Sequence, residues 1–101
     1  MFFRTKHLQF EARPERPDPV FAKMLQEPLG GQWGEMSVMM TYLFQGWNCR
    51  GPQKYKDMIM DIGTEEIAHV EMLATMIARL RKARLSRRRR RRLATASWAR
   101  C

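Results

Sequence analysis

The stretch that decides the fold runs from Pro52 to Leu80 and reads PQKYKDMIMDIGTEEIAHVEMLATMIARL. Within it, eight positions follow one another in steps of four and three residues, which is the spacing of one packing seam on an α-helix. Six of these positions carry apolar or aromatic side chains, and the middle two carry Glu66 and His69. The pattern predicts one long helix from about Pro52 to at least Leu80. The seam consists of Tyr55, Ile59, Ile62, Glu66, His69, Leu73, Met76 and Leu80.

A second long helix is predicted upstream of this one. Apolar and aromatic residues recur with helical spacing from Gln32 to about Trp47, and the exit is marked by Gly46, Asn48, Gly51 and Pro52. The connection is about five residues long, as in helical hairpins. We therefore expect the two long helices to be antiparallel neighbours.

The residues before these helices predict an extended segment and one short helix. Three prolines within residues 1–19 disfavour helix there, because each fixes its own φ and restrains the residue before it. Asp18 followed by Pro19 is typical of a helix N-terminus, so a short helix is predicted from Pro19 to about Glu27. Pro28 and the pair Gly30–Gly31 are expected to stop it.

These elements predict an all-α fold in which two long antiparallel helices follow a short helix and an extended N-terminal segment. Two helices with apolar stripes this wide cannot cover each other on all sides. The chain is therefore predicted to be a fragment of a helical bundle, whose remaining helices come from the same chain or from another.

Charge divides the 101 residues into two parts. The chain has a formal net charge of +9, but residues 1–78 carry eight cations and ten acids, while residues 79–101 carry eleven cations and no acid. We predict a domain over residues 1–80 and an arginine-rich, low-complexity tail over 81–101. Two cysteines cannot build a disulfide scaffold, and no apolar run is long enough for a signal peptide or a membrane span. These features predict a cytoplasmic location and no membrane contact.

Glu66 and His69 are the polar residues inside the predicted seam. A buried carboxylate costs several kcal/mol unless it is paired, protonated or bound to a metal. An E-x-x-H step brings a carboxylate and an imidazole to the same ion, and Glu35 on the other long helix offers a further carboxylate. This donor set suits manganese or iron, and Tyr42, two turns after Glu35, is placed to donate a hydrogen bond to a ligating carboxylate. The alternative is a plain ion pair between His69 and a neighbouring glutamate.

Asp57 and Asp61 lie one turn apart on another face of the long helix. Hard oxygen ligands of this kind suit Ca²⁺. A solvated acidic face explains the same pair, and the residues alone favour that interpretation.

Several segments, in order, closely resemble the N-terminal part of the non-haem manganese catalases. The resemblance covers about residues 1–80, and its most specific pieces are Gly-Gly-x-x-Gly-Glu and Thr-Glu-Glu-x-x-His. The segments are LQEPLGGQWGEMS (25–37), MTYL (40–43), QGW (45–47), KYKD (54–57) and GTEEIAHVEM (63–72).

The resemblance implies a ferritin-like four-helix bundle that disproportionates hydrogen peroxide with a pair of manganese ions, usually as a homo-oligomer of six chains. It implies that Glu35 is a terminal ligand, that Glu66 bridges the two ions and that His69 is a nitrogen ligand. Asp57 and Asp61 match positions that contribute to a calcium site in some members. Tyr42 matches a tyrosine beside the metal ligands.

The sequence also departs from the family. Family members are much longer, and their third and fourth helices supply another glutamate and histidine that nothing after residue 80 replaces. The chain is therefore expected to hold half of the metal ligands. The sequence alone does not decide whether the isolated chain is an enzyme. After residue 80 the sequence becomes rich in arginine and no longer follows the family. A frameshift, a truncated reading frame or a fragment would produce such a change.

Three functions remain open at this point. The first is manganese-dependent peroxide disproportionation by descent, with little turnover by the isolated chain. The second is nonspecific nucleic-acid binding through the arginine-rich tail, because arginine runs release counterions from phosphates. The third is a structural helical hairpin that pairs with a second copy to restore four helices.

Overall fold

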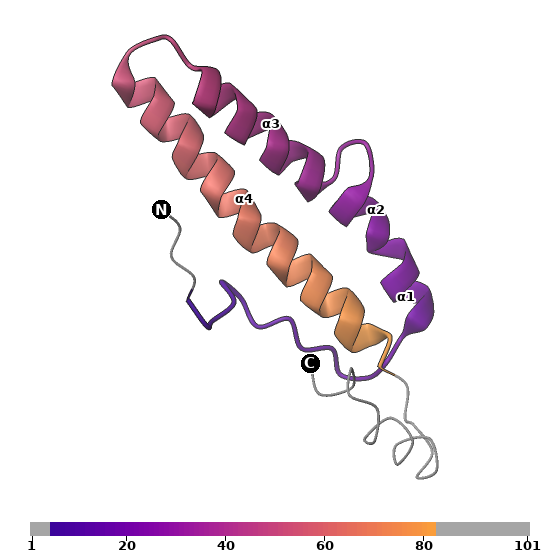
Figure 1. Cartoon of the computed structure of the whole chain (residues 1–101). Helices are drawn as coiled ribbons and strands as arrows, with labels where there is room; N and C mark the ends of the chain where they lie inside the picture. Colours follow the sequence, from indigo (N-terminus) through magenta and orange to yellow (C-terminus); the bar gives the residue numbers. More distant parts are fainter. Residues whose placement is uncertain (1–4, 83–101) are drawn as a thin grey trace, which may run out of the picture.

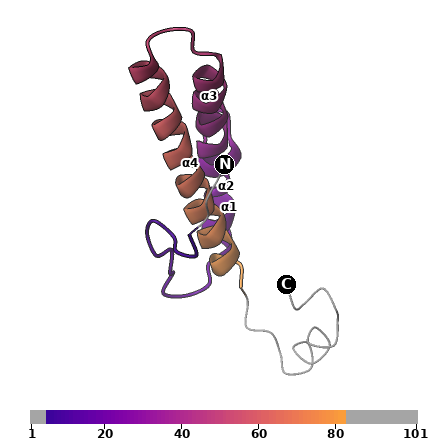
Figure 2. The ribbon, with the colours of Figure 1, turned by 60° about the vertical axis from the view of Figure 1, so that its left-hand side comes forward.

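The computed structural model describes residues 5–82, and this part of the chain contains helices and no strand. The helices α3 and α4 lie side by side and antiparallel, while α1 and α2 follow the other half of α4 (Figures 1 and 2). This arrangement confirms the predicted all-α hairpin. The helices are α1 (Pro19–Met24), α2 (Gln26–Gly30), α3 (Glu35–Asn48) and α4 (Gln53–Leu80).

The two long helices occur where the hydrophobic spacing predicts them. Helix α4 starts directly after Pro52 and ends at Leu80, as expected. Helix α3 starts at Glu35, three residues later than the prediction, because the preceding residues form a turn. In this turn Gly34 N donates to Gly31 O at 3.0 Å, and Ser37 Oγ donates to the same oxygen at 3.1 Å. The turn places Glu35 at the first position of α3.

The predicted short helix is present as two short helices joined at Leu25. Asp18 caps α1 by accepting a hydrogen bond from Phe21 N at 3.0 Å. The expectation that Pro28 stops the helix is wrong. Because α2 starts at Gln26, Pro28 falls in its first turn, where backbone N–H groups have no partner within the helix.

Two glycines allow α3 and α4 to approach closely. A Cβ at Gly63 of α4 would lie 2.9 Å from Leu43 Cδ2 and 3.3 Å from Leu43 N. A Cβ at Gly46 of α3 would overlap the sulfur of Met60. Both glycines and Leu43 are buried. The absence of side chains at these two points sets how near the backbones of α3 and α4 lie.

The other half of α4 packs against α1, α2 and the extended N-terminal segment. Ala22, Ile77 and Leu80 form a buried cluster, with Leu25, Leu29 and Met76 against it. Backbone hydrogen bonding also fixes this end, since Asp18 N donates to Leu80 O at 2.9 Å. Arg79 Nη1 donates to Ala12 O at 2.7 Å, which holds the extended segment against α4.

Much apolar surface stays uncovered in the described part of the chain. Only five hydrophobic residues are buried, whereas twelve large ones are exposed, up to 84% for Trp33. Exposed apolar surface on this scale is typical of an interaction face. No helix among residues 5–82 has the length and apolarity needed to cross a bilayer. The predicted arginine-rich tail lies almost entirely outside the described residues.

We predict that Gly63→Ala destabilises the hairpin. The added Cβ would press on both the side chain and the backbone of Leu43, and overpacking of this kind costs about 1–3 kcal/mol, more than the helix propensity that alanine adds. Urea unfolding followed by circular dichroism measures the change. Gly30→Ala is the matched control, because its nearest neighbour is 3.9 Å away at Met36 Sδ. Equal stability of the two variants would contradict the close approach.

Candidate metal centre

The hairpin brings together the three residues that the sequence singled out as ligands. Glu35 opens α3, while Glu66 and His69 lie one turn apart near the middle of α4. His69 Nδ1 is 2.8 Å from Glu66 Oε2 and 3.7 Å from Glu35 Oε2. One donor atom from each residue lies within 4.8 Å of the other two. The three side chains therefore converge on one point between the helices.

The cluster is partly shielded from water. Side-chain exposure is 14% for Glu66, 31% for His69 and 34% for Glu35. Glu66 is thus the most enclosed of the three, and His69 and Glu35 border the open side. Shielding strengthens charge interactions within the group.

The three groups shift one another's pKa values. A hydrogen bond with Glu66 raises the pKa of Glu35 above its ordinary 4.5, and burial and the charge of Glu66 add to this effect. Burial acts to raise the pKa of Glu66, but hydrogen bonds from Glu35 and His69 outweigh it and lower that pKa. The hydrogen bond to Glu66 raises the pKa of His69 above 6.5, although burial opposes it. Without a metal, the cluster thus favours a proton where a cation would sit.

The donor set fits a manganese ion. Two carboxylates and one imidazole are the hard and borderline ligands that suit manganese and iron. A bound cation removes the repulsion between the carboxylates and compensates for their partial burial. A metal binds the deprotonated forms of these groups, so its affinity increases with pH.

The other predicted site residues lie away from this cluster. Asp57 and Asp61 are exposed on α4, and Asp57 accepts a hydrogen bond from Gln53 Nε2 at 2.7 Å. Among residues 5–82, only Glu35, Glu66 and His69 form a group of three potential ligands. The calcium site at Asp57 and Asp61 stays a prediction.

Tyr42 borders a pocket of about 320 Å³ on α3 that includes Ser37, Val38 and Gln45. Its hydroxyl makes no hydrogen bond to the glutamates in the part of the chain that the structure describes. Its predicted role beside the ligands therefore stays a prediction.

Sequence reasoning missed the residues that hold the ligands in place. Gly46 and Gly63 let the two helices approach closely enough for Glu35 to reach His69 and Glu66. The sequence signal was weak, because a glycine inside a helical pattern costs about 1 kcal/mol relative to alanine but does not by itself show a close contact. Gly63 lies one turn before Glu66.

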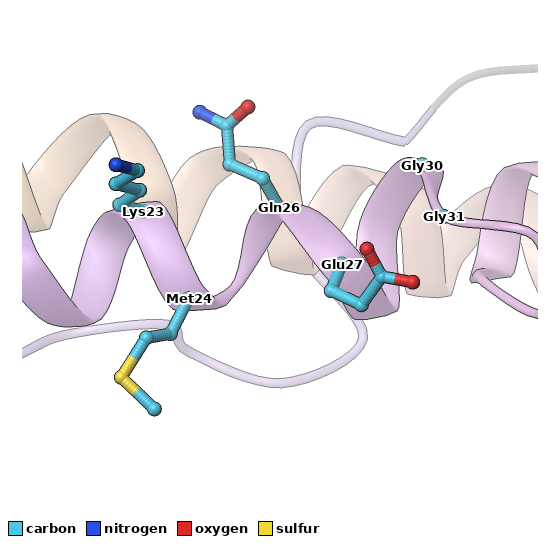
Figure 3. Close-up of a pocket in the computed structure, with 6 residues that line it drawn as sticks. All are labelled: Lys23, Met24, Gln26, Glu27, Gly30 and Gly31. Carbon is cyan, nitrogen blue, oxygen red and sulfur yellow. The ribbon is translucent and has the colours of Figure 1, made fainter.

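A separate pocket lies on α1 and α2, outside the ligand cluster. Its volume is about 590 Å³, and Lys23, Met24, Gln26, Glu27, Gly30 and Gly31 line it. Lys23 and Gln26 project to one side of the ribbon, whereas Met24 and Glu27 project to the other (Figure 3). The pocket shares no residue with the cluster of Glu35, Glu66 and His69.

Helical hairpins that carry carboxylate and histidine ligands are units of bundle metalloproteins. The sequence matches the family model of manganese-containing catalases over residues 1–96. It is 69% identical over 80 residues to a manganese catalase of Bacillus subtilis, covering 79% of this chain and 29% of the relative. The manganese catalase of Lactiplantibacillus plantarum is 59% identical over 80 residues, covering 79% and 30%. The chain therefore belongs to the manganese-containing catalase family.

A more distant relative gives a similar result. Protein CotJC of Bacillus subtilis strain 168 is 40% identical over 82 residues, covering 81% of this chain and 42% of the relative. The chain thus spans less than half the length of these relatives. The family model extends beyond residue 80, and the division of the chain there stays a prediction.

We predict that Glu66→Gln lowers the pKa of His69 in the metal-free protein toward its ordinary 6.5, because it removes the charge next to the imidazole. Titration of the His69 ring resonances by NMR measures the shift. Glu71→Gln, on the same helix but outside the cluster, should leave the titration unchanged. A native His69 that titrates at or below 6.5 would contradict the pairing.

Proposed function

We propose that this chain binds manganese through Glu35, Glu66 and His69 and provides half of a centre that disproportionates hydrogen peroxide. The observation that supports the proposal is the convergence of these side chains, which lie on two different helices, within 4.8 Å. An ion pair between Glu66 and His69 alone does not require a second carboxylate. The presence of Glu35 favours a cation over the plain ion pair.

Each ligand has a distinct proposed role. Glu66 is the most enclosed carboxylate, and its two oxygens suit a bridge between two ions. Glu35 is more exposed and opens its helix, which suits a terminal ligand on one ion. His69 presents Nδ1 to both glutamates and would supply the nitrogen donor.

The reaction requires electrons and protons to move together. One peroxide loses two electrons and two protons to become O₂, and a second peroxide gains both to become two molecules of water. Manganese supplies the electron storage when it is bound. The protons need acceptors with suitable pKa values close to the centre.

The half site limits what the isolated chain can do. Bundle sites for two metals take a glutamate from each of two helices and an E-x-x-H motif from each of two others. The described residues provide one glutamate and one such motif. A two-electron change needs both ions, so we propose that a single chain has little activity alone.

Calcium binding at Asp57 and Asp61 and nucleic-acid binding through the tail are weaker proposals. The aspartates have no third acidic or histidine ligand among residues 5–82. Nucleic-acid binding is supported by the charge of residues 79–101, which carry eleven cations and no acid. Neither feature contributes to the metal centre.

We predict that Glu66→Ala abolishes manganese binding, because Glu66 contacts His69 directly and is the most enclosed donor. Electron paramagnetic resonance of free Mn²⁺ during titration of the 101-residue protein measures the binding. Glu71→Ala removes a carboxylate that lies on the same helix but outside the cluster. This variant should bind manganese as the native chain does. Unchanged binding by Glu66→Ala would contradict the proposed site.

We predict that the manganese-loaded chain, under conditions in which it is a monomer, evolves oxygen from peroxide at least about a hundredfold more slowly than a full-length relative, because one shell lacks the second ion. An oxygen electrode measures the rate. Comparable rates per manganese ion would show that the half site is sufficient.

A further inference from the structure

A basic cavity lies where the extended N-terminal segment passes the end of α4 (Figure 1). Its volume is about 410 Å³, within the range of roughly 300–1,000 Å³ that is typical of small-molecule sites. Residues 13–17 contribute one part of its lining, and Arg79 and Lys82 contribute the rest. The cavity shares no residue with the cluster of Glu35, Glu66 and His69.

Hydrogen bonds fasten the extended segment to α4 on both sides of the cavity lining. Before residues 13–17, Ala12 O accepts a hydrogen bond from Arg79 Nη1 at 2.7 Å. After them, Asp18 N donates to Leu80 O at 2.9 Å. Residues 13–17 therefore form a short bridge that is held at two points by the last turn of α4.

Two prolines stiffen this bridge. The dipeptide Arg-Pro occurs twice in it, as Arg13–Pro14 and as Arg16–Pro17. Each proline fixes its own φ and restricts the arginine before it to extended conformations. A cavity lined by a restrained backbone loses less conformational entropy when it binds a ligand.

The cavity gathers more positive than negative charge. Four cations line it, together with one acid, Glu15. Arg13 is paired with Glu11, with Nε 3.2 Å from Oε2. The other three cations form no ion pair among residues 5–82, and the sequence outside this range contains no acidic side chain. The four cations are Arg13, Arg16, Arg79 and Lys82.

The position of α4 explains only part of this charge. The helix dipole favours cations near a helix C-terminus, which accounts for Arg79 and Lys82. It does not account for Arg16, which lies on the extended segment and lines the same cavity. Like charges around one cavity repel one another, and a multiply charged anion removes this repulsion.

Arg79 is the cation best positioned to bind an anion. Its side chain is half-buried and held in place by the hydrogen bond to Ala12 O. A guanidinium carries several N–H donors in one plane, and only one of them is used within residues 5–82. The remaining donors suit the oxygens of a phosphate group, which arginine binds in a bidentate manner.

We propose that this cavity binds a chain of linked phosphates, either inorganic or carried by a nucleotide. One phosphate group carries a charge of about −1.5 to −2 at neutral pH, which is less than the three unpaired cations provide. A chain of phosphates matches these cations better and lets Arg16 and Arg79, from two different elements, bind the same ligand. The site does not depend on the metal centre.

Isothermal titration calorimetry of the 101-residue protein with inorganic tripolyphosphate tests the site. Arg16 is exposed and makes no hydrogen bond through its side chain among residues 5–82, so Arg16→Gln should fold normally and weaken binding at least about threefold. Arg79→Lys keeps the charge but loses the planar donors, and it should weaken binding by a similar factor. Circular dichroism checks that each variant keeps its helices.

Two matched controls separate the cavity from the overall charge of the chain. Arg88→Gln removes the same charge from the arginine-rich tail and should change the affinity less than about twofold at physiological ionic strength. Glu15→Gln removes the one carboxylate in the lining and should strengthen binding at least about twofold. Glu27→Gln makes the same change of net charge outside this cavity and should leave the affinity unchanged.

The probes identify the ligand, and the variants locate it. ATP should compete with tripolyphosphate for the cavity, and the tighter of the two indicates whether the phosphates are inorganic or carried by a nucleotide. Inorganic phosphate that binds as tightly as tripolyphosphate would overturn the assignment to a phosphate chain. Equal losses from Arg16→Gln and Arg88→Gln would overturn the cavity and assign the binding to the tail. Glu66→Ala should leave phosphate binding unchanged, so that failure of this site and failure of the metal centre are distinguishable.

Discussion

The candidate site is defined by one contact between α3 and α4, where the carboxylates of Glu35 and Glu66 approach the imidazole of His69. Glu66 and Glu35 lie 2.8 Å and 3.7 Å from the same nitrogen of His69, in a seam whose other positions are apolar. Two partly buried carboxylates repel each other unless a proton or a cation lies between them. In the metal-free chain, Glu66 raises the pKa values of both Glu35 and His69 above their ordinary values. A cation that prefers oxygen and nitrogen ligands would compensate the charges of the same three groups.

The backbone makes this approach possible. The turn before α3 places Glu35 at the helix start, and Gly46 and Gly63 remove the side chains that would hold α3 and α4 apart. At the other end, Asp18 N donates to Leu80 O, and the guanidinium of Arg79 donates to Ala12 O, which ties the N-terminal segment to α4. The hairpin thus fixes Glu35, Glu66 and His69 from both sides along α4, although few of residues 5–82 are buried.

The sequence predicted the helices and singled out three residues that the structure brings together, because both leave periodic signals. The seam of α4 gave its length, and Glu66 and His69 were visible as polar residues in an apolar series. The pairing of Glu35 with them required only that the two helices be antiparallel. The break at Leu25 and the position of Pro28 within α2 were not predicted, since a proline in a first turn and a proline that ends a helix look alike in sequence. The spacing between the helices also needed the structure, because it depends on atoms packed around two glycines.

The central claim is that one cation binds between Glu35, Glu66 and His69, and paramagnetic broadening tests it most directly. Substoichiometric Mn²⁺ added to isotope-labelled protein broadens the NMR signals of nuclei near the ion. The account predicts that signals of Glu35, Glu66 and His69 broaden first and that the broadening weakens along α4 toward Asp57. Broadening centred on Asp57 and Asp61, or spread evenly over the acidic residues, would contradict it.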